Sequence, residues 1–241
     1  MTSPLEDSLS LTFLEDIANL QIGFYPPQVK ACRQIMDAFV SGKRWVMLAA
    51  KPQTGKTGAG KLVAFSTKLP KFESLGINKI IIISSDNRIN LKEQWEASVD
   101  NSKKILSHIA MEMFCGTPTD ERTCKLIKWI LSIGCIKIDV LFRGPDLVKH
   151  LKKENCKSTL FIWDECDYGI GSESKFSDML DEMEWGDCVR TGDFTTFATQ
   201  NNYMLTITAT RGAECANDAF TRACGQVYMP PGGDYKDIQW F

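Results

Sequence analysis

The stretch from Trp45 to Lys61, WVMLAAKPQTGKTGAGK, limits what the chain can fold into more than any other part of its 241 residues. Its first part, Trp45–Ala50, is apolar and predicts a short buried strand. The segment from Ala50 to Thr57 then fits the phosphate-loop pattern, which ends in Gly-Lys-Thr at the start of a helix. The sequence therefore predicts a strand, a loop and a helix that together can hold a polyphosphate.

Each residue type in this loop has a chemical task. Successive backbone N–H groups must converge on the phosphates, Lys56 must reach the outer phosphates, and the Thr57 hydroxyl must ligate Mg²⁺ at a helix start whose dipole favours an anion. Gln53 stands where a more flexible residue is commoner, which leaves the loop conformation open. A strand, turn and helix with a chance Gly-Lys-Thr is the alternative. The residues expected to contact a nucleotide here are Gln53, Thr54, Gly55, Lys56, Thr57 and Gly58.

Composition narrows the class of protein. A net charge of −2 gives no overall attraction to nucleic acid or membranes, so any nucleic-acid contact must be local. The nine cysteines include no C-x-x-C pair and only two histidines accompany them, so a structural zinc site is not expected. The sequence contains neither a secretion leader nor a long apolar span. We expect a soluble intracellular protein without a membrane partner, in a reducing compartment such as the cytoplasm or nucleus.

A second candidate contact precedes the phosphate loop. The residues Tyr25-Pro26-Pro27-Gln28 open a helix that is expected to run to Val40, with proline in its first turn. The Tyr25 ring can stack on a base, and the Gln28 amide can pair with the N6 and N7 edge of adenine. An ordinary helix start explains the same residues equally well.

Small polar residues follow two further expected strands. Lys79–Ser84 is an apolar run typical of a strand that is covered on both faces, and Ser85 and Asn87 come after it. Ile136–Phe142 is also an expected strand, and Arg143-Gly144 follows it. Open parallel sheets bind ligands at the carboxyl ends of their strands, so these groups could hold a phosphodiester backbone. Helix caps and turns are the alternative.

Two carboxylates follow directly after the strand expected at Thr159–Trp163. Carboxylates at the end of an apolar strand are costly unless a cation offsets them, and a magnesium nucleotide would do so. Asp164 would then hold Mg²⁺ through water and Glu165 would polarise the attacking water. A solvated acidic turn is the alternative.

The last expected strand, Tyr203–Ile207, ends in Thr208-Ala209-Thr210. Its two hydroxyls can contact a neighbouring carboxylate such as Asp167, although a β-branched strand end is also plausible. Strands that alternate with helices predict an α/β fold, with a doubly wound, mainly parallel sheet, helices on both faces and the nucleotide at the carboxyl edge. We expect a lead-in over residues 1–20, a nucleotide-binding domain over 21–228 and a linker over 229–241.

In their order, these elements resemble the first RecA-like domain of superfamily 2 (DExD/H-type) helicases and translocases. The resemblance covers about Gly23 to Thr210, and the order and spacing of the motifs carry it more than any single motif. The matching pieces are Tyr25-x-x-Gln28 for the adenine motif, Ala50–Thr57 for motif I, Ser84–Arg88 for motif Ia, Arg143-Gly144-Pro145 for motif Ib, Asp164–Asp167 for motif II and Thr208-Ala209-Thr210 for motif III.

The resemblance implies an enzyme that uses ATP and Mg²⁺ and couples NTP hydrolysis to movement along DNA or RNA. Its catalytic residues would be Lys56 and Glu165, and its metal ligands Thr57 and Asp164. The residues along the nucleic-acid strand would be Ser85, Asn87, Arg143 and Gly144, and those that couple the two sites would be Asp167, Thr208 and Thr210. Contacts to backbone phosphates rather than bases suit a nearly neutral chain with local positive sites.

Two features depart from this family. Cys166 replaces a small residue of motif II, and the family's second RecA-like domain, with its arginine fingers, is absent and is expected C-terminal to this chain. Without an arginine finger, which is often worth ~10³-fold or more, hydrolysis by this chain alone is expected to be slow. A P-loop phosphotransferase and a non-catalytic, nucleotide-gated scaffold are the alternative functions.

Overall fold

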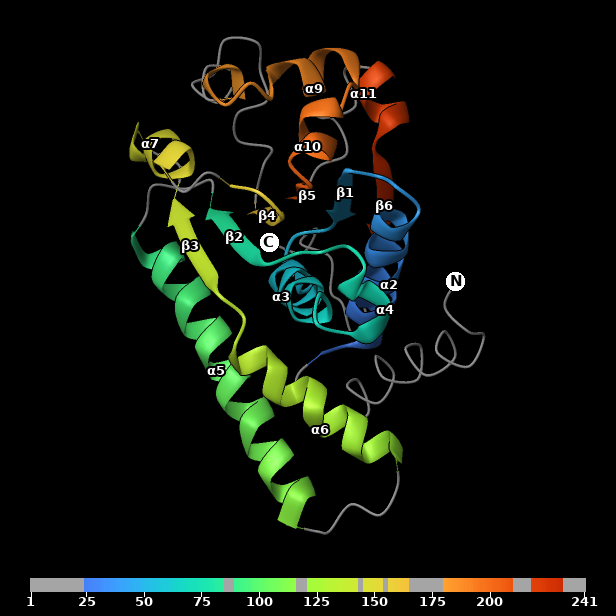
Figure 1. Cartoon of the computed structure of the whole chain (residues 1–241), viewed down its shortest axis with the longest axis vertical. Helices are drawn as coiled ribbons and strands as arrows, with labels where there is room; N and C mark the ends of the chain where they lie inside the picture. Colours follow the sequence, from blue (N-terminus) through green and yellow to red (C-terminus); the bar gives the residue numbers. More distant parts are fainter. Residues whose placement is uncertain are drawn as a thin grey trace, which may run out of the picture.

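The computed structural model describes residues 24–84, 89–115, 121–142, 145–153, 156–164, 180–209 and 218–231. The strands in this part of the chain form one six-stranded sheet in the order β3-β2-β4-β5-β1-β6 (Figure 1). Every neighbouring pair is parallel, which confirms the expected α/β fold. The strands are β1 (Trp45–Ala50), β2 (Lys79–Ser84), β3 (Ile138–Phe142), β4 (Thr159–Asp164), β5 (Tyr203–Thr208) and β6 (Gly225–Met229).

Successive side chains of the central strands enter two separate cores, one on each face of the sheet. In β1, Val46, Leu48 and Ala50 belong to one core, whereas Trp45 and Met47 belong to the other. Strands β2 and β4 alternate in the same way. Because both faces are buried, these strands are continuous apolar runs rather than alternating ones.

Helices cover both faces, as the sequence predicts. The first core is covered by α2 (Pro26–Val40), α3 (Lys56–Ser66), α4 (Pro70–Glu73), α5 (Ile89–Cys115) and α6 (Glu121–Gly134). The second core is covered by α7 (Pro145–Lys153), α9 (Gly186–Thr191), α10 (Thr195–Thr199) and α11 (Asp218–Ala223). Aromatic rings fill much of the second core: the ring centroids of Phe161 and Trp185 are 4.9 Å apart, and those of Trp185 and Phe197 are 5.1 Å apart. Ring pairs at such distances stabilise a core beyond the area that they bury.

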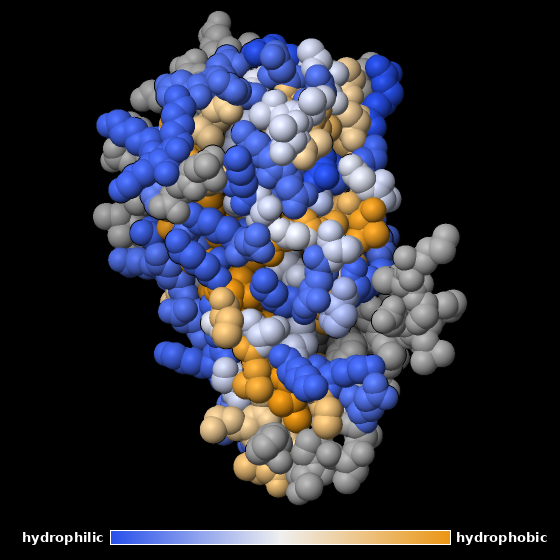
Figure 2. Space-filling view, in the orientation of Figure 1, coloured by the Kyte–Doolittle hydropathy of each residue, from blue (hydrophilic) through white to orange (hydrophobic). Residues whose placement is uncertain are grey.

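Helices α5 and α6 form a pair that extends away from the sheet (Figure 1). The sequence from Lys103 to Gly116 fits a strand as well as a helix, and the structure resolves this in favour of one helix that runs to Cys115. Figure 2 shows apolar side chains on the surface of this pair, and the exposed apolar residues of the two helices are Ile105, Met111 and Leu131. None of the helices in the described ranges combines the length and apolarity that a bilayer crossing requires.

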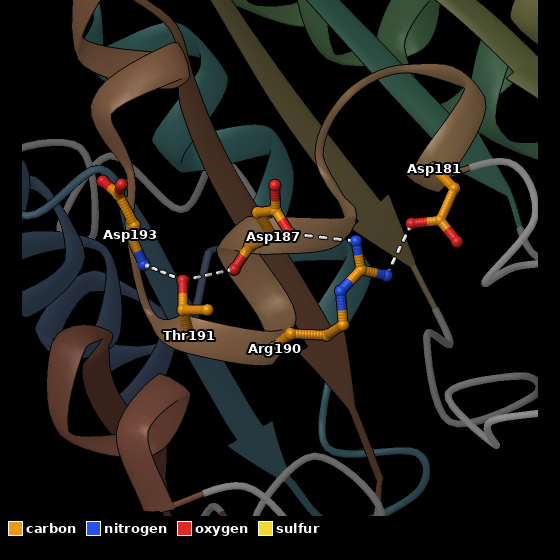
Figure 3. A network of polar contacts seen from close by, with 5 residues as sticks. All are labelled: Asp181, Asp187, Arg190, Thr191 and Asp193. Atoms are coloured by element: carbon orange, nitrogen blue, oxygen red, sulfur yellow. Dashed lines mark hydrogen bonds and ion pairs between the residues drawn. The ribbon is translucent and has the colours of Figure 1, made fainter.

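The segment from 186 to 202, which the sequence predicts as polar and turn-rich, contains the short helices α9 and α10. Polar contacts rather than a periodic apolar face hold α9 (Figure 3). Arg190 Nη1 donates to Asp181 Oδ1 over 2.7 Å and its Nη2 donates to Asp187 Oδ1 over 2.9 Å. The Thr191 hydroxyl donates to the Asp187 carbonyl over 2.8 Å. A helix of six residues is too short for hydrophobic periodicity to reveal.

Candidate nucleotide-binding site

The phosphate loop and Asp164 lie at the same edge of the sheet. Strand β5 runs between β1 and β4, with Ala49 level with Thr208 and Ile207 level with Asp164. Because all three strands are parallel, their carboxyl ends meet at this edge. One strand therefore separates the end of β1, where the phosphate loop begins, from the carboxylate that ends β4.

The phosphate loop is a tight turn that ends at the start of α3. The Thr54 hydroxyl donates to the Lys51 carbonyl over 2.7 Å, and Gly55, with φ of +84°, is the residue that precedes α3. Gln53 has φ of +59°, in the left-handed region, where a non-glycine residue costs about 1–2 kcal/mol. The loop thus closes with Gln53 itself in the conformation that a more flexible residue adopts more readily.

The first N–H groups of α3 come from predicted phosphate contacts. Lys56, Thr57 and Gly58 precede the first bond of the helix, in which the Ala59 N–H donates to the Gly55 carbonyl over 3.2 Å. Amides at a helix start point along the axis and favour an anion through the helix dipole. The start of α3 is therefore suited to hold a phosphate group.

Gln28 lies against the phosphate loop. Its Nε2 donates to the Gly55 carbonyl over 2.7 Å, and its Oε1 accepts from the Tyr25 N–H over 2.7 Å. The residue is only 2% exposed, whereas Tyr25 is 65% exposed. The Gln28 amide thus links the start of α2 to the loop, a contact that sequence reasoning missed because the two segments are 27 residues apart. Recognition of adenine by Gln28 and Tyr25 stays a prediction.

Asp164 accepts a hydrogen bond that the sequence did not suggest. Trp95 Nε1, on α5, donates to Asp164 Oδ2 over 2.9 Å, and Trp95 is 3% exposed. The Leu-Lys-Glu-Gln-Trp segment that contains Trp95 indicates a helix, but no periodicity pairs it with a carboxylate 69 residues later. Trp95 is the clearest addition that the structure makes to the site.

The donors at this edge fit Mg²⁺ shared with a nucleotide. Within the described ranges, no group of three or more His, Cys, Asp or Glu residues could hold a metal. Mg²⁺ is usually bound by one or two protein oxygens together with phosphates and water, rather than by a cage of side chains. The Thr57 hydroxyl and the Asp164 carboxylate are oxygen donors of this kind.

The remaining predicted site residues divide into two groups. Thr208 ends β5 and is 2% exposed. Seven others lie outside the described residues: Ser85, Asn87, Arg143, Gly144, Glu165, Asp167 and Thr210. Three of the segments to which they belong follow the carboxyl ends of β2, β3 and β4, where Ser84 is level with both Phe142 and Asp164.

No protein-family model matches the sequence, and no curated protein matches it. Among solved structures, the chain is similar to the DEAD-box helicase Mss116 bound to single-stranded RNA and UDP-BeF, with 18% identity and a TM-score of 0.52 over 85% of this chain and 40% of that chain. It is also similar to a second solved ATPase domain, with 12% identity over 82% of this chain and 72% of that chain, but a TM-score of 0.38 carries no argument.

The chain thus spans 40% of the length of the helicase that it matches. At 18% identity the likeness to Mss116 concerns the fold. The sheet agrees with it, because all six strands are parallel and the phosphate loop follows β1. The described residues therefore have the RecA-like fold of a helicase ATPase domain.

Proposed function

We propose that this chain is the ATP-binding first motor domain of an ATP-dependent helicase or translocase that acts on DNA or RNA. The observation that carries the proposal is the position of the phosphate loop and Asp164 on either side of β5, at one edge of a parallel sheet. A nucleotide bound at the loop and a metal bound at Asp164 would then be close enough to share one site.

In this proposal Lys56 and the first amides of α3 bind the phosphates, and Thr57 and Asp164 hold Mg²⁺. The metal would offset the negative charge of the phosphates. Glu165, directly after Asp164, would orient the attacking water and accept its proton. Tyr25 and Gln28 would contact the base, for which the exposed ring of Tyr25 offers a stacking surface.

Nucleic acid would bind farther along the same edge. The predicted contacts Ser85 and Asn87 follow β2, and Arg143 and Gly144 follow β3, the outermost strand on that side. Mss116, which shares the fold, is bound to single-stranded RNA in its structure. We propose backbone contacts here, because they need local positive charge and not a basic protein. The coupling residues would be Asp167, Thr208 and Thr210, and a second RecA-like domain would complete the motor.

The cysteines of the described residues support a reducing compartment, the cytoplasm or the nucleus. All of them are free thiols, and burial raises the pKa of the Cys32 thiol to about 12. A thiol with so high a pKa is poorly reactive.

ATP hydrolysis by variants of this chain tests the proposed chemistry. Lys56→Ala and Glu165→Gln should each lower the rate of phosphate release by about 100-fold or more, since each removes a group that acts on the transferred phosphate or the attacking water. The matched control is Lys30→Ala, which removes an exposed lysine of α2 and should leave the rate unchanged. Unchanged hydrolysis in both site variants would refute the proposal. Transfer of phosphate to an acceptor would instead favour the phosphotransferase.

Binding of a single-stranded oligonucleotide tests the proposed partner. Affinity should fall steeply with salt and should change when an ATP analogue is added. Nucleotide binding without any linked, salt-dependent nucleic-acid binding would instead favour the scaffold.

A further inference from the structure

The hydrogen bond between Trp95 and Asp164 joins a helix to the carboxylate that is proposed to hold the metal. Asp164 is the last residue of β4, and Trp95 lies in α5, which follows β2 in the chain. The indole N–H donates to Oδ2 over 2.9 Å. Because an indole N–H is a donor only, this contact always uses one carboxylate oxygen as its acceptor.

The indole ring is held in place by its surroundings. Trp95 is 3% exposed. Gly60 of α3 allows the close approach of the ring, because a Cβ atom at Gly60 would lie 3.3 Å from Trp95 Cη2 and 3.1 Å from Ile207 Cδ1. A ring packed between α3 and the sheet has little freedom to turn, so the direction of its N–H group is fixed before any ligand binds.

Other buried indoles of the protein make longer contacts to neutral acceptors. Trp129 Nε1 donates to the Phe65 carbonyl over 3.3 Å, and Trp45 Nε1 donates to the Thr206 hydroxyl over 3.3 Å. Hydrogen bonds to a carboxylate are shorter and about twice as strong. The contact to Asp164 is thus the one whose loss should affect a charged site.

We propose that Trp95 is a positioning residue for the metal, which fixes the plane of the Asp164 carboxylate through its indole N–H; this inference rests on the proposed function. The terminal torsion of an aspartate is broad, so an unrestrained carboxylate presents its oxygens in many directions. A donor that holds one oxygen of a metal-binding carboxylate removes that freedom, and the loss of such a donor typically lowers metal affinity by about 10–100-fold. Trp95 therefore sets how the site meets Mg²⁺ without touching the nucleotide.

The test is a Mg²⁺ titration of nucleotide binding to the full chain. Trp95→Phe keeps an aromatic ring and removes the N–H group, and Trp129→Phe is the matched control that removes a buried indole N–H elsewhere. In Trp95→Phe, the Mg²⁺ concentration for half-maximal binding of a fluorescent ATP analogue should rise by about 10-fold or more. Binding of the analogue in EDTA should stay unchanged. In the control, both quantities should match those of the wild type.

A second measurement keeps the inference testable if Trp95→Phe is poorly folded. Compared with the NMR spectrum of the wild type, that of Asp164→Ala should show a shifted indole N–H resonance for Trp95 and an unchanged one for Trp129. An unmoved Trp95 resonance would overturn the inference, as would a Trp95→Phe variant with wild-type Mg²⁺ dependence or with equal losses in Mg²⁺ and EDTA. A wild-type chain that binds nucleotide without any Mg²⁺ dependence would overturn the proposed metal site as well, so the two failures are distinguishable.

Discussion

The contact between Gln28 and the phosphate loop explains why glycine is needed at Gly58. A Cβ atom at Gly58 would overlap Gln28 Nε2 and lie 2.9 Å from its Cδ. The Gln28 side chain would then have to move, which breaks its bond to the Gly55 carbonyl. The glycine that follows the Gly-Lys-Thr sequence is therefore required by a side chain of another helix.

Gly58→Ala should lower the free energy of unfolding by about 1–3 kcal/mol in the wild type, because a buried amide loses its partner. In a Gln28→Ala background the overlap is absent, so the same substitution should raise it by about 0.5 kcal/mol through reduced backbone entropy of the unfolded chain. Urea unfolding of the four proteins measures both values. A loss of equal size in both backgrounds would show that the overlap is not the cause.

Lys61 gives the stability of the protein a dependence on alkaline pH. Its Nζ donates to the hydroxyls of Ser98 and Ser102 over 2.8 and 3.1 Å, and burial lowers its pKa from 10.5. Between the lowered pKa and 10.5 the unfolded chain binds more protons than the folded one, so the free energy of unfolding contributed by this group rises with pH.

Compared with Lys61→Met, the wild type should therefore gain stability as the pH is raised from neutral toward 10.5. Unfolding in denaturant at several pH values measures the difference between the two proteins. Lys30→Met, at an exposed site, should show a flat difference. A flat difference for Lys61→Met as well would contradict the effect of burial.

At the scale of elements, Asn202 fixes β4 beside β5. Its Oδ1 accepts from the Thr159 N–H over 3.1 Å and its Nδ2 donates to the Cys156 carbonyl over 2.9 Å. Thr159 begins β4, and Asn202 immediately precedes β5. This fully buried amide sets the level at which the two strands start, and with it the level at which Asp164 and Thr208 end them.

Asn202→Ala should cost about 3 kcal/mol of unfolding free energy, since it leaves a buried N–H and a buried carbonyl without their partner. Gln226→Ala removes an exposed amide that donates to the Thr221 carbonyl and should change stability by less than about 0.5 kcal/mol. Similar small losses in both variants by thermal or urea unfolding would show that the Asn202 contacts do not set this register.

The long apolar runs predicted most of the sheet, because a strand buried on both faces has few polar residues. The expected strands at Trp45–Ala50 and Lys79–Ser84 match β1 and β2, and the helix from Pro26 to Val40 matches α2. Strand β6, at the edge of the sheet, was missed. Its side chains alternate between buried and exposed over only five residues, too short a pattern to stand out.

The candidate site was predicted in the same uneven way. Gly55, Lys56 and Thr57 are recognisable because the loop is contiguous in sequence, and Asp164 because it ends an apolar run. Trp95 and the loop contact of Gln28 could not be found, since each depends on a side chain that the fold brings from a distant helix. Local patterns predict residues that act together in one segment, and long-range packing decides the rest.

At the scale of the whole molecule, ligand binding should stabilise the fold by mass action. A magnesium–ATP concentration about 100 times the Kd should raise the free energy of unfolding by about 2.7 kcal/mol. Lys56→Ala should abolish this gain, and Lys30→Ala should keep it. Thermal unfolding with and without the nucleotide measures the effect, and an equal gain in the Lys56→Ala variant would place the nucleotide elsewhere.

The central claim is that the phosphate loop and Asp164 share one metal-bound nucleotide. Paramagnetic Mn²⁺ added with an ATP analogue tests this most directly, through the loss of NMR intensity near the metal. We predict strong loss for both the Gly55 amide and the Trp95 indole N–H, and little for the Trp45 indole at the opposite end of β1. Loss at only one of the two sites, or the same loss without nucleotide, would contradict the account.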